Sequence, residues 1–506
     1  MVVGAAVAEK VEDLEKPDGP WLLPDGWEWV PLKRLSSFIG RGRGPTYVAS
    51  GGVPVVNQKC IRWHRLEPKH FKLTSRDAFD RLATELHIRA GDLLWNSTGT
   101  GTIGRAVVYD GSIPELTIDS HVTLVRPTSV EPSYLGYFIE TLRVQHLVID
   151  GHVGSTNQQE LPRSFVEDLL IPLPPSAEQC RIVARLDALF AEIADGEAAL
   201  AMVQEGLGTF RRALLKSAVT GELTKDWRAA NPGSETGTDL FARIGKKRVH
   251  QGARARVAEP ARLDTSTLPQ LPRGWNWATL DGIAESVRNG TSAAPRAASN
   301  DHEILRISAV RPLRIDETQI RFLDSDQAKA AAAATVEAGD LLFTRYNGSA
   351  ELVGVGAIYR GPKRFYPDKI IRVRLEPVLS MLAEFVELAV NTGVSRKHIA
   401  ANIKTTAGQQ GLSGESLKAT PIPIPPPAEA EEVVRRVSDA LSASADTLAL
   451  LDAEAADVAR LKQSILKAAF EGRLVPQDPA DESASALLAR LISHPTAKRA
   501  RTKGGS

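Results

Sequence analysis

The strongest constraint on the fold is a long internal repeat. The stretch LPDGWEWVPL at Leu23–Leu32 returns as LPRGWNWATL at Leu271–Leu280, about 250 positions later, and AGDLLW at Ala90 returns as AGDLLF at Ala338. This period is too long for a solenoid repeat, whose units have roughly 20 to 50 residues. The 506-residue chain is therefore expected to be a tandem duplication of a whole module.

A glycine motif in the first copy raises the question of a cofactor site. GTGTIG, which ends at Gly104, has the spacing of a dinucleotide-binding loop, but such a loop must open a helix. The residues that follow, RAVVYDGSIPELTIDSHVTLVRP, are β-branched and broken by turn residues, which indicates strands. The spacing is lost in the second copy, and Arg105 and Ala106 replace the Lys and Ser or Thr of a phosphate-binding P-loop. We predict a glycine-rich loop between strands.

Each copy ends in a proline run followed by a helical pattern. IPLPPSAEQCRIVARLDALF from Ile171 matches IPIPPPAEAEEVVRRVSDAL from Ile422, and Ser176 with Gln179 predicts a capping box at the start of the first helix. Apolar residues then step by four and three, which is typical of a coiled coil. The predicted seam residues are Ile182, Leu186, Leu189, Ile193, Leu200, Val203, Leu207, Phe210 and Leu214 in the first helix, interrupted at Gly196, and Val433, Val437, Leu451, Val458, Leu461 and Ile465 in the second.

The two helices are predicted to pair antiparallel and to relate the copies by a pseudo-two-fold axis. Two amphipathic helices packed on separate domains are the alternative. The globular parts mix short strands with helical stretches, so we expect an α+β fold with mixed α/β domains separated by the helices. The expected ranges are 1–21 (tail), 22–173 (first domain), 174–222 (first helix), 223–269 (linker with a short helix), 270–425 (second domain), 426–473 (second helix) and 474–506 (tail). The pairs Trp27/Trp29 and Trp275/Trp277 are expected to pack the start of each domain.

Charge is unevenly distributed although the net charge is only +1. Eight Lys or Arg residues and one acid, Glu67, lie between Arg41 and Arg76, and a second basic cluster lies between Arg360 and Arg374. Such clusters can neutralise phosphates and bring polar side chains to base edges. A solvated basic face is the alternative.

Other classes of site are disfavoured by composition. Two cysteines and ten histidines show no metal-ligand spacing, so we expect no metal site. No apolar run reaches the roughly 18 residues of a membrane span, and the acidic N-terminal stretch does not resemble a signal peptide. We expect a cytoplasmic protein that does not bind a membrane.

Taken together, these motifs resemble the specificity subunit of type I restriction-modification systems. The resemblance is carried by GDLLWNSTGTGTIGRAVVY, TIDSHVTLVRP, GSTNQQELP and IPLPPSAEQCRIVARLDALF in the first copy, and by GDLLFTRYNGSAELVGVGAIY, GQQGLSGESLKATPIPIPPPAEAEEVV and ILKAAFEGRLVPQDP in the second. It covers nearly the whole chain beyond the first twenty residues or so. The second junction departs from the pattern, with PPPAEAEE where the first copy has PPSAEQCR.

The resemblance implies a non-catalytic subunit of a bacterial or archaeal complex. Each globular part would be a target recognition domain that reads one half of an asymmetric bipartite DNA sequence, and the helices would set the half-site spacing. The implied partners are double-stranded DNA and two methyltransferase subunits that carry S-adenosylmethionine and methylate adenine. ATP would be bound by restriction subunits, whose presence the sequence leaves open. No methylation motif, ATPase loop or nuclease cluster is found in this chain, which is expected to bind no cofactor.

Residue type, loop position and repeat equivalence nominate the side chains that contact DNA. In the first copy they are Arg41, Arg43, Asn57, Gln58, Lys59, Arg62, His64, Asn96, Thr98, His121, Asn157 and Gln158. In the second copy they are Arg288, Asn289, Arg306, Arg311, Arg345, Tyr346, Asn347, Arg364, Thr406 and Gln409. A coiled-coil interaction scaffold and a nucleotide-cofactor enzyme built on GTGTIG remain the alternative functions.

Overall fold

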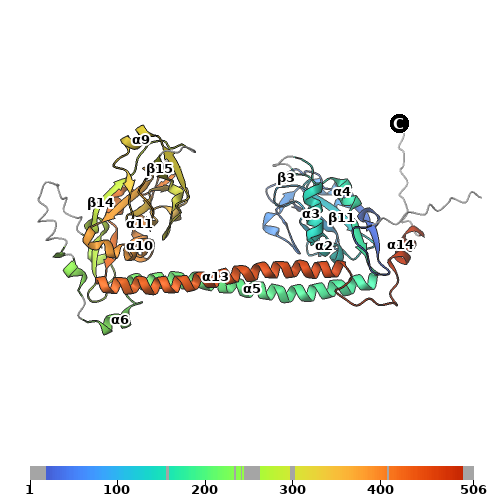
Figure 1. Cartoon of the computed structure of the whole chain (residues 1–506). Helices are drawn as coiled ribbons and strands as arrows, with labels where there is room; N and C mark the ends of the chain where they lie inside the picture. The colour runs from blue at the N-terminus through green and yellow to red at the C-terminus, as the bar shows by residue number, and fades with distance from the viewer. Residues whose placement is uncertain are drawn as a thin grey trace, which may run out of the picture. The chain divides into compact units, whose positions relative to one another are not determined.

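The chain forms two compact units, each made of residues from both halves of the sequence. The computed structural model describes residues 19–154, 159–232, 235–240, 242–243, 263–296, 302–406 and 409–493. Unit 1 is Met1–Leu200 with Asp452–Ser506, and unit 2 is Ala201–Leu451. Two long helices, α5 (Ser176–Thr220) and α13 (Pro427–Phe470), are each continuous and contribute one half to each unit (Figure 1).

The globular part of unit 1 is built on two four-stranded sheets. The first has the order β2 (Ser36–Arg41), β11 (Val122–Pro127), β8 (Leu93–Asn96) and β9 (Ala106–Val108), with every pair antiparallel. The second has the order β10 (Thr117–Ile118), β4 (Val53–Val56), β7 (Lys72–Thr74) and β3 (Tyr47–Val48), in which only β10 and β4 are parallel. Helices α2 (Pro132–Glu140), α3 (Leu142–Gly151) and α4 (Arg163–Asp168) follow these strands.

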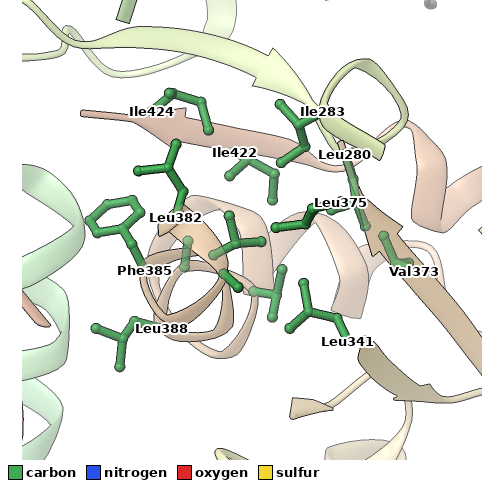
Figure 2. Packing of buried hydrophobic residues seen from close by; sticks show 14 of the residues in the cluster. Leu280, Ile283, Leu341, Val373, Leu375, Leu382, Phe385, Leu388, Ile422 and Ile424 are labelled. Carbon is green, nitrogen blue, oxygen red and sulfur yellow. The ribbon is translucent and has the colours of Figure 1, made fainter. Parts of the chain in front are cut away.

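Unit 2 repeats the first sheet and three strands of the second sheet, whose fourth strand lies at the opposite edge from that in unit 1. Its first sheet has the order β14 (Ala284–Asn289), β24 (Ile370–Leu375), β20 (Leu341–Thr344) and β22 (Gly356–Ile358), and its second has the order β18 (Ile320–Leu323), β15 (His302–Leu305), β23 (Arg364–Phe365) and β19 (Thr335–Val336). Helices α10 (Ala383–Asn391) and α11 (Gly393–Ala401) complete the unit. Apolar side chains of α10, including Phe385, share one core with Val373 of β24 and Ile422 (Figure 2). The predicted α+β class and tandem organisation are confirmed.

The glycine motif forms the predicted loop between strands. It connects β8 to the antiparallel strand β9, and no helix opens at its last glycine. Gly99, Gly101 and Gly104 have φ values of 100°, 76° and 89°, a region that side chains with a Cβ rarely adopt. The glycines of GTGTIG are therefore required by the backbone conformation of this turn. The helical segment after β11 is divided into α2 and α3, because the extended residue Thr141 separates them and caps α3 through its hydroxyl.

The start and end of each globular part pair as strands. Strand β1 (Glu28–Pro31) pairs antiparallel with β12 (Leu170–Leu173), and β13 (Asn276–Thr279) pairs in the same way with β27 (Pro421–Ile424). Trp27 is buried as expected, and its Nε1 donates a 2.9 Å hydrogen bond to Glu178 in the first turn of α5. Each long helix therefore leaves the domain beside the strand where that domain began.

The prediction of a capping box between Ser176 and Gln179 is wrong, because the Gln179 side chain bonds other residues. Helix α5 begins at Ser176, and the amide N–H of Gln179 donates to the carbonyl of Pro175. The Gln179 side chain instead donates to the carbonyl of Pro174 at 2.9 Å and accepts the N–H of Glu131 at 2.7 Å. The buried Gln179 amide thus links the start of α5 to the loop before α2, and these hydrogen bonds satisfy its polar atoms.

Within each unit the two helix halves pack against each other. Leu186 and Phe470 belong to one core cluster in unit 1, and Leu214 and Val433 belong to one cluster in unit 2. Because α5 enters unit 1 with its first half and α13 with its last half, this pairing is antiparallel, as expected. The other predicted seam residues that these clusters contain or that pack against them are Ile182, Val437 and Ile465.

The middle of the predicted seam is not buried. Val203, Phe210 and Leu461 are 47%, 45% and 50% exposed, which differs from the expectation for these seam positions. The sequence around them explains the difference, because Gly196, Gly206 and many Ala and Ser residues offer little apolar surface for a partner helix to cover. Leu189, Ile193, Leu200, Leu207, Leu451 and Val458 are half-buried.

No single helix in the described ranges is long and apolar enough to cross a membrane. The bent pair Pro377–Asn391 and Gly393–Ala401 meets the requirements of length and composition only.

An ion pair between an arginine and a buried aspartate recurs in both copies and explains the aspartate of the repeated AGDLL motif. Arg126 of β11 binds both carboxylate oxygens of Asp92 at 2.8 and 2.7 Å, and Arg374 of β24 binds Asp340 at 2.7 and 2.8 Å. Both aspartates are 2% or less exposed. Bidentate arginine–carboxylate pairs fix geometry as well as charge. These pairs lock the central strand of each first sheet to the turn before its neighbour.

Replacing Asp92 with alanine is expected to lower the free energy of unfolding of unit 1 by about 3–5 kcal/mol, because Arg126 would stay buried without its counter-charge. Urea titration followed by tryptophan fluorescence measures this change. Asp168→Ala is the matched control, since Asp168 pairs with Lys33 on the surface and should cost little. Equal losses in the two variants would contradict the assignment.

Candidate nucleic-acid interface

A polar pocket of about 590 Å³ in unit 1 collects several of the predicted DNA-binding residues. Four loops form it: the segment after β2, the turn after β4, the segment before β7, and the turn between β10 and β11. The pocket is lined by Gly44, Tyr47, Asn57, Gln58, Lys59, Lys69, His70, Lys72, Asp119, Ser120 and His121. Of these, Asn57, Gln58, Lys59 and His121 were nominated from the sequence.

The turn after β4 is built by Asn57. Its Oδ1 accepts the N–H of Lys59 at 2.9 Å, and its Nδ2 donates to the carbonyl of His70 at 2.7 Å. Asn57 itself is only 6% exposed, whereas Lys59 is exposed. Asn57 therefore has a structural role that presents Lys59, since Asx turns of this kind fix the loop backbone.

A second set of hydrogen bonds joins the glycine loop to the turn before β11. Thr98 Oγ1 lies 2.7 Å from His121 Nδ1 and 3.4 Å from Gln58 Oε1. Asn96 is fully buried and its Nδ2 donates to the carbonyls of Gln58 and Thr102 at 3.0 and 3.2 Å. Asn96 therefore holds the loops together from below, while His121 lies on their exposed side.

The basic cluster of the first copy surrounds its one acid. Arg62, Arg65, Lys69 and His70 lie 3.1, 3.6, 3.8 and 3.3 Å from the carboxylate of Glu67. Desolvation would raise the pKa of Glu67, but these positive charges outweigh it and lower the pKa. One carboxylate cannot neutralise the whole group, so the loop keeps a positive charge that suits phosphate.

Two residues that the sequence analysis missed lie in the same pocket. Asp119 is 3% exposed, and its Oδ1 accepts the N–H of His121 at 2.9 Å. Burial raises the pKa of Asp119, and burial beside Asp119 raises the pKa of Tyr47 to about 12. The adjacency of Asp119 to His121 in TIDSH was a signal that could have nominated it.

Four other predictions from the first copy lie apart from the pocket lining or are engaged elsewhere, and two lie outside the described residues. Arg41 donates to Glu160 and to the carbonyl of Leu161, and Arg43 is exposed in the following loop. His64 lies 2.7 Å from Glu140 and its ring is 5.1 Å from that of Tyr137, on the side that meets α2. Arg62 also donates to the carbonyls of Lys59 and Ile61, and Asn157 and Gln158 lie outside the described residues.

The predictions in unit 2 also separate into engaged and exposed side chains. Arg364 is bound between Glu303 and Glu317, at 2.5 and 3.2 Å, which indicates a structural role. Arg345 reaches the carbonyl of Asp368, and its guanidinium lies 4.9 Å from the centre of the Tyr346 ring. Arg288, Asn289 and Arg306 are exposed, Arg311 and Asn347 are half-buried, and Thr406 and Gln409 pair in the hairpin β25 (Lys404–Thr406) and β26 (Gln409–Gly411).

One glycine in each copy sets the position of the turn before the central strand. The N–H of Gly42 donates to the carbonyl of Val122, and the N–H of Gly290 donates to the carbonyl of Ile370. A Cβ at Gly42 would collide with the carbonyl oxygens of Ile118 and Asp119, and one at Gly290 would meet the equivalent backbone of Tyr366 and Pro367. Only glycine allows the two backbones to approach this closely.

Gly42→Ala is expected to displace the turn that carries Asp119 and to lower the stability of unit 1 by about 1–3 kcal/mol, the typical cost of overpacking. Urea titration would measure the loss. Gly44→Ala is the control in the same loop, because its Cβ would only reach the Ser120 hydroxyl at 4.0 Å. Equal stability of the two variants would show that the close approach is unimportant.

The fold and the site define a class of protein: a tandem two-domain chain with two long helices and a basic, loop-built pocket. Residues 24–200 match the family described as type I restriction modification DNA specificity domain. The specificity subunits of EcoKI from Escherichia coli K12 and StySPI from Salmonella potsdam are 29% and 26% identical, each covering 93% of this chain and 95% of the relative. A chain from a solved structure concerned with assembly of the type I R-M system has the same fold, with a TM-score of 0.60 at 16% identity, covering 90% of this chain and 100% of that one.

The chain is therefore similar over nearly its whole length to type I restriction-enzyme specificity subunits, and residues 24–200 match their DNA specificity domain. Members of this class are non-catalytic, which fits a site made of recognition side chains.

Proposed function

We propose that this chain reads an asymmetric bipartite DNA sequence, with one half-site read by each globular part. The observation that carries the proposal is the unit 1 pocket, in which Lys59, Lys69 and Lys72 surround hydrogen-bonding side chains. Lysines of this kind bind phosphates without regard to sequence, whereas amide, imidazole and carboxylate groups discriminate base edges. The similarity to specificity subunits of type I restriction enzymes supports the same interpretation.

Different half-sites are expected because equivalent backbone positions carry different side chains. The N–H of Ser97 donates to the carbonyl of His121, and the N–H of Arg345 donates to the carbonyl of Lys369 in the second copy. The same frame thus presents Thr98 and His121 in unit 1 but Tyr346 and Lys369 in unit 2. A change of donor and acceptor groups changes the preferred base.

The helices are proposed to set the half-site spacing and to bind two methyltransferase subunits. The half of α5 in unit 2 exposes Met202 by 73%, together with Val203 and Phe210. Exposed large apolar side chains of this kind are typical of a protein-binding surface. S-adenosylmethionine would be bound by the methyltransferase subunits and ATP by restriction subunits where these are present, with no cofactor on this chain.

Single-molecule sequencing tests the function in a host that expresses the chain with its cognate methyltransferase and in a host that lacks the chain. We expect methylated adenines confined to a split, asymmetric motif, which disappears without the chain. Methylation that persists in its absence would favour the interaction scaffold and contradict the reading role. An expression check of each subunit by immunoblot accompanies both samples.

Adding about two helical turns to the middle of both α5 and α13 is expected to lengthen the gap between half-sites. Seven residues add about 10 Å of helix, or about three base pairs of DNA, at 1.5 Å per residue and 3.4 Å per base pair. The methylated motif of the variant measures the gap. An unchanged gap with normal methylation would contradict the role of the helices as a spacer.

A further inference from the structure

The unit 1 pocket contains a buried carboxylate beside three lysines. Asp119 shares the pocket with Lys59, Lys69 and Lys72, yet among the described residues no basic side chain forms an ion pair with it. This contrasts with Asp92, which is equally buried and is paired with Arg126. A buried carboxylate without such a partner is costly, so its presence calls for a partner that binds from outside.

One oxygen of this carboxylate is left with little to bind. Oδ1 accepts the N–H of His121 at 2.9 Å, but the contact of Oδ2 with the Tyr47 hydroxyl is 3.4 Å, beyond the usual 2.5–3.0 Å of an O–H···O bond. Asp119 is 97% buried, so this oxygen has little access to bulk water. The lining of the pocket thus holds an acceptor that lacks a donor at normal distance.

The chemistry of DNA limits what that donor can be. A phosphate would be repelled by the carboxylate, whereas the three lysines of the pocket attract it. An ionised carboxylate only accepts hydrogen bonds, and the donors of the major groove are the amino groups of cytosine and adenine. Adenine presents the acceptor N7 beside its amino group, which suits an amide better than a carboxylate. Cytosine N4 is therefore the best match.

We propose that Asp119 accepts a hydrogen bond from the N4 amino group of a cytosine and so fixes one C·G base pair in the half-site read by unit 1. This inference rests on the proposed DNA-reading function and assigns one specificity-determining residue within it. The turn of unit 2 has Pro367 at the equivalent position, as the shared contacts with Gly42 and Gly290 establish. Unit 2 therefore has no carboxylate there, and the two half-sites are expected to differ at this position.

The substitution Asp119→Asn tests the assignment in the complex with the methyltransferase subunits. Asparagine keeps Oδ1 as the acceptor for His121 but adds donors, so the turn is retained while the preference for cytosine is lost. We expect the methylated motif to accept adenine or other bases at one position of one half-site, with discrimination there reduced about 10- to 100-fold. The other half-site and the spacing should not change. Asp80→Asn, an exposed change outside the pocket, is the matched control.

A second measurement is made first on the wild-type complex. The wild-type complex is given duplexes in which each cytosine of the motif is replaced in turn by a base that lacks the N4 amino group. One replacement should lower the methylation rate by the same 10- to 100-fold, and Asp119→Asn should be insensitive to that replacement alone. This comparison remains informative even if the variant folds poorly.

The outcomes separate the inference from the function on which it rests. A wild-type motif without cytosine in either half-site, an unchanged motif in Asp119→Asn, or a loss of binding that is uniform over all sequences would each overturn the role of Asp119 while the reading function stands. Absence of any split motif with the wild-type chain would overturn the function itself.

Discussion

The packing of one helix half against the other within each unit is the interaction on which the structure depends. In unit 1 Phe470, in the last turn of α13, belongs to the same buried cluster as Leu186 of α5, and its ring lies 5.0 Å from that of Tyr134 and 5.1 Å from that of Phe138. One aromatic side chain thus joins both helices to the globular part. Because the core of each unit contains residues from both long helices, neither unit is complete when only half of the chain is present. Contacts of such long sequence separation predict slow folding.

The recognition loops depend in turn on rigid positions beneath them. The Arg126–Asp92 and Arg374–Asp340 pairs hold the central strands, and Gly42 and Gly290 hold the turns that lead into those strands. These groups contact other parts of their own domain, so the loop side chains are not needed to hold the loops in place. A site that must present several polar groups within a fraction of an ångström requires such support.

The sequence was sufficient for features that depend on local pattern. The repeat, the glycine loop and both long helices are found within a few residues of their expected positions, since proline stops and apolar spacing act over short distances. It was insufficient where the partner is remote in sequence. Arg364 was nominated as a DNA contact because of its charge, but Glu303 and Glu317 hold it, and no local pattern could connect them.

His64 and Asp119 illustrate the same limit of sequence-based prediction. His64 was nominated but lies outside the pocket lining, whereas Asp119 was not nominated but lies within it. His64 lies in a basic run, but the tight turn between Arg62 and Arg65 directs it to Glu140, away from the pocket. The burial of Asp119 beside three lysines becomes visible only when the four loops are brought together. The predicted DNA contacts of the pocket residues remain predictions, and the structure adds the hydrogen-bond partners of these residues.

The use of main-chain hydrogen bonds to hold the reading turns has an evolutionary consequence. Ser97 and Arg345 make the same backbone contact although their side chains have nothing in common. A frame fixed by N–H groups, carbonyls and one glycine accepts unrelated side chains, as Ser97 and Arg345 show. New DNA sequences could thus be acquired by a few substitutions in a loop, without any repair of the core, and the two halves of one chain could diverge independently.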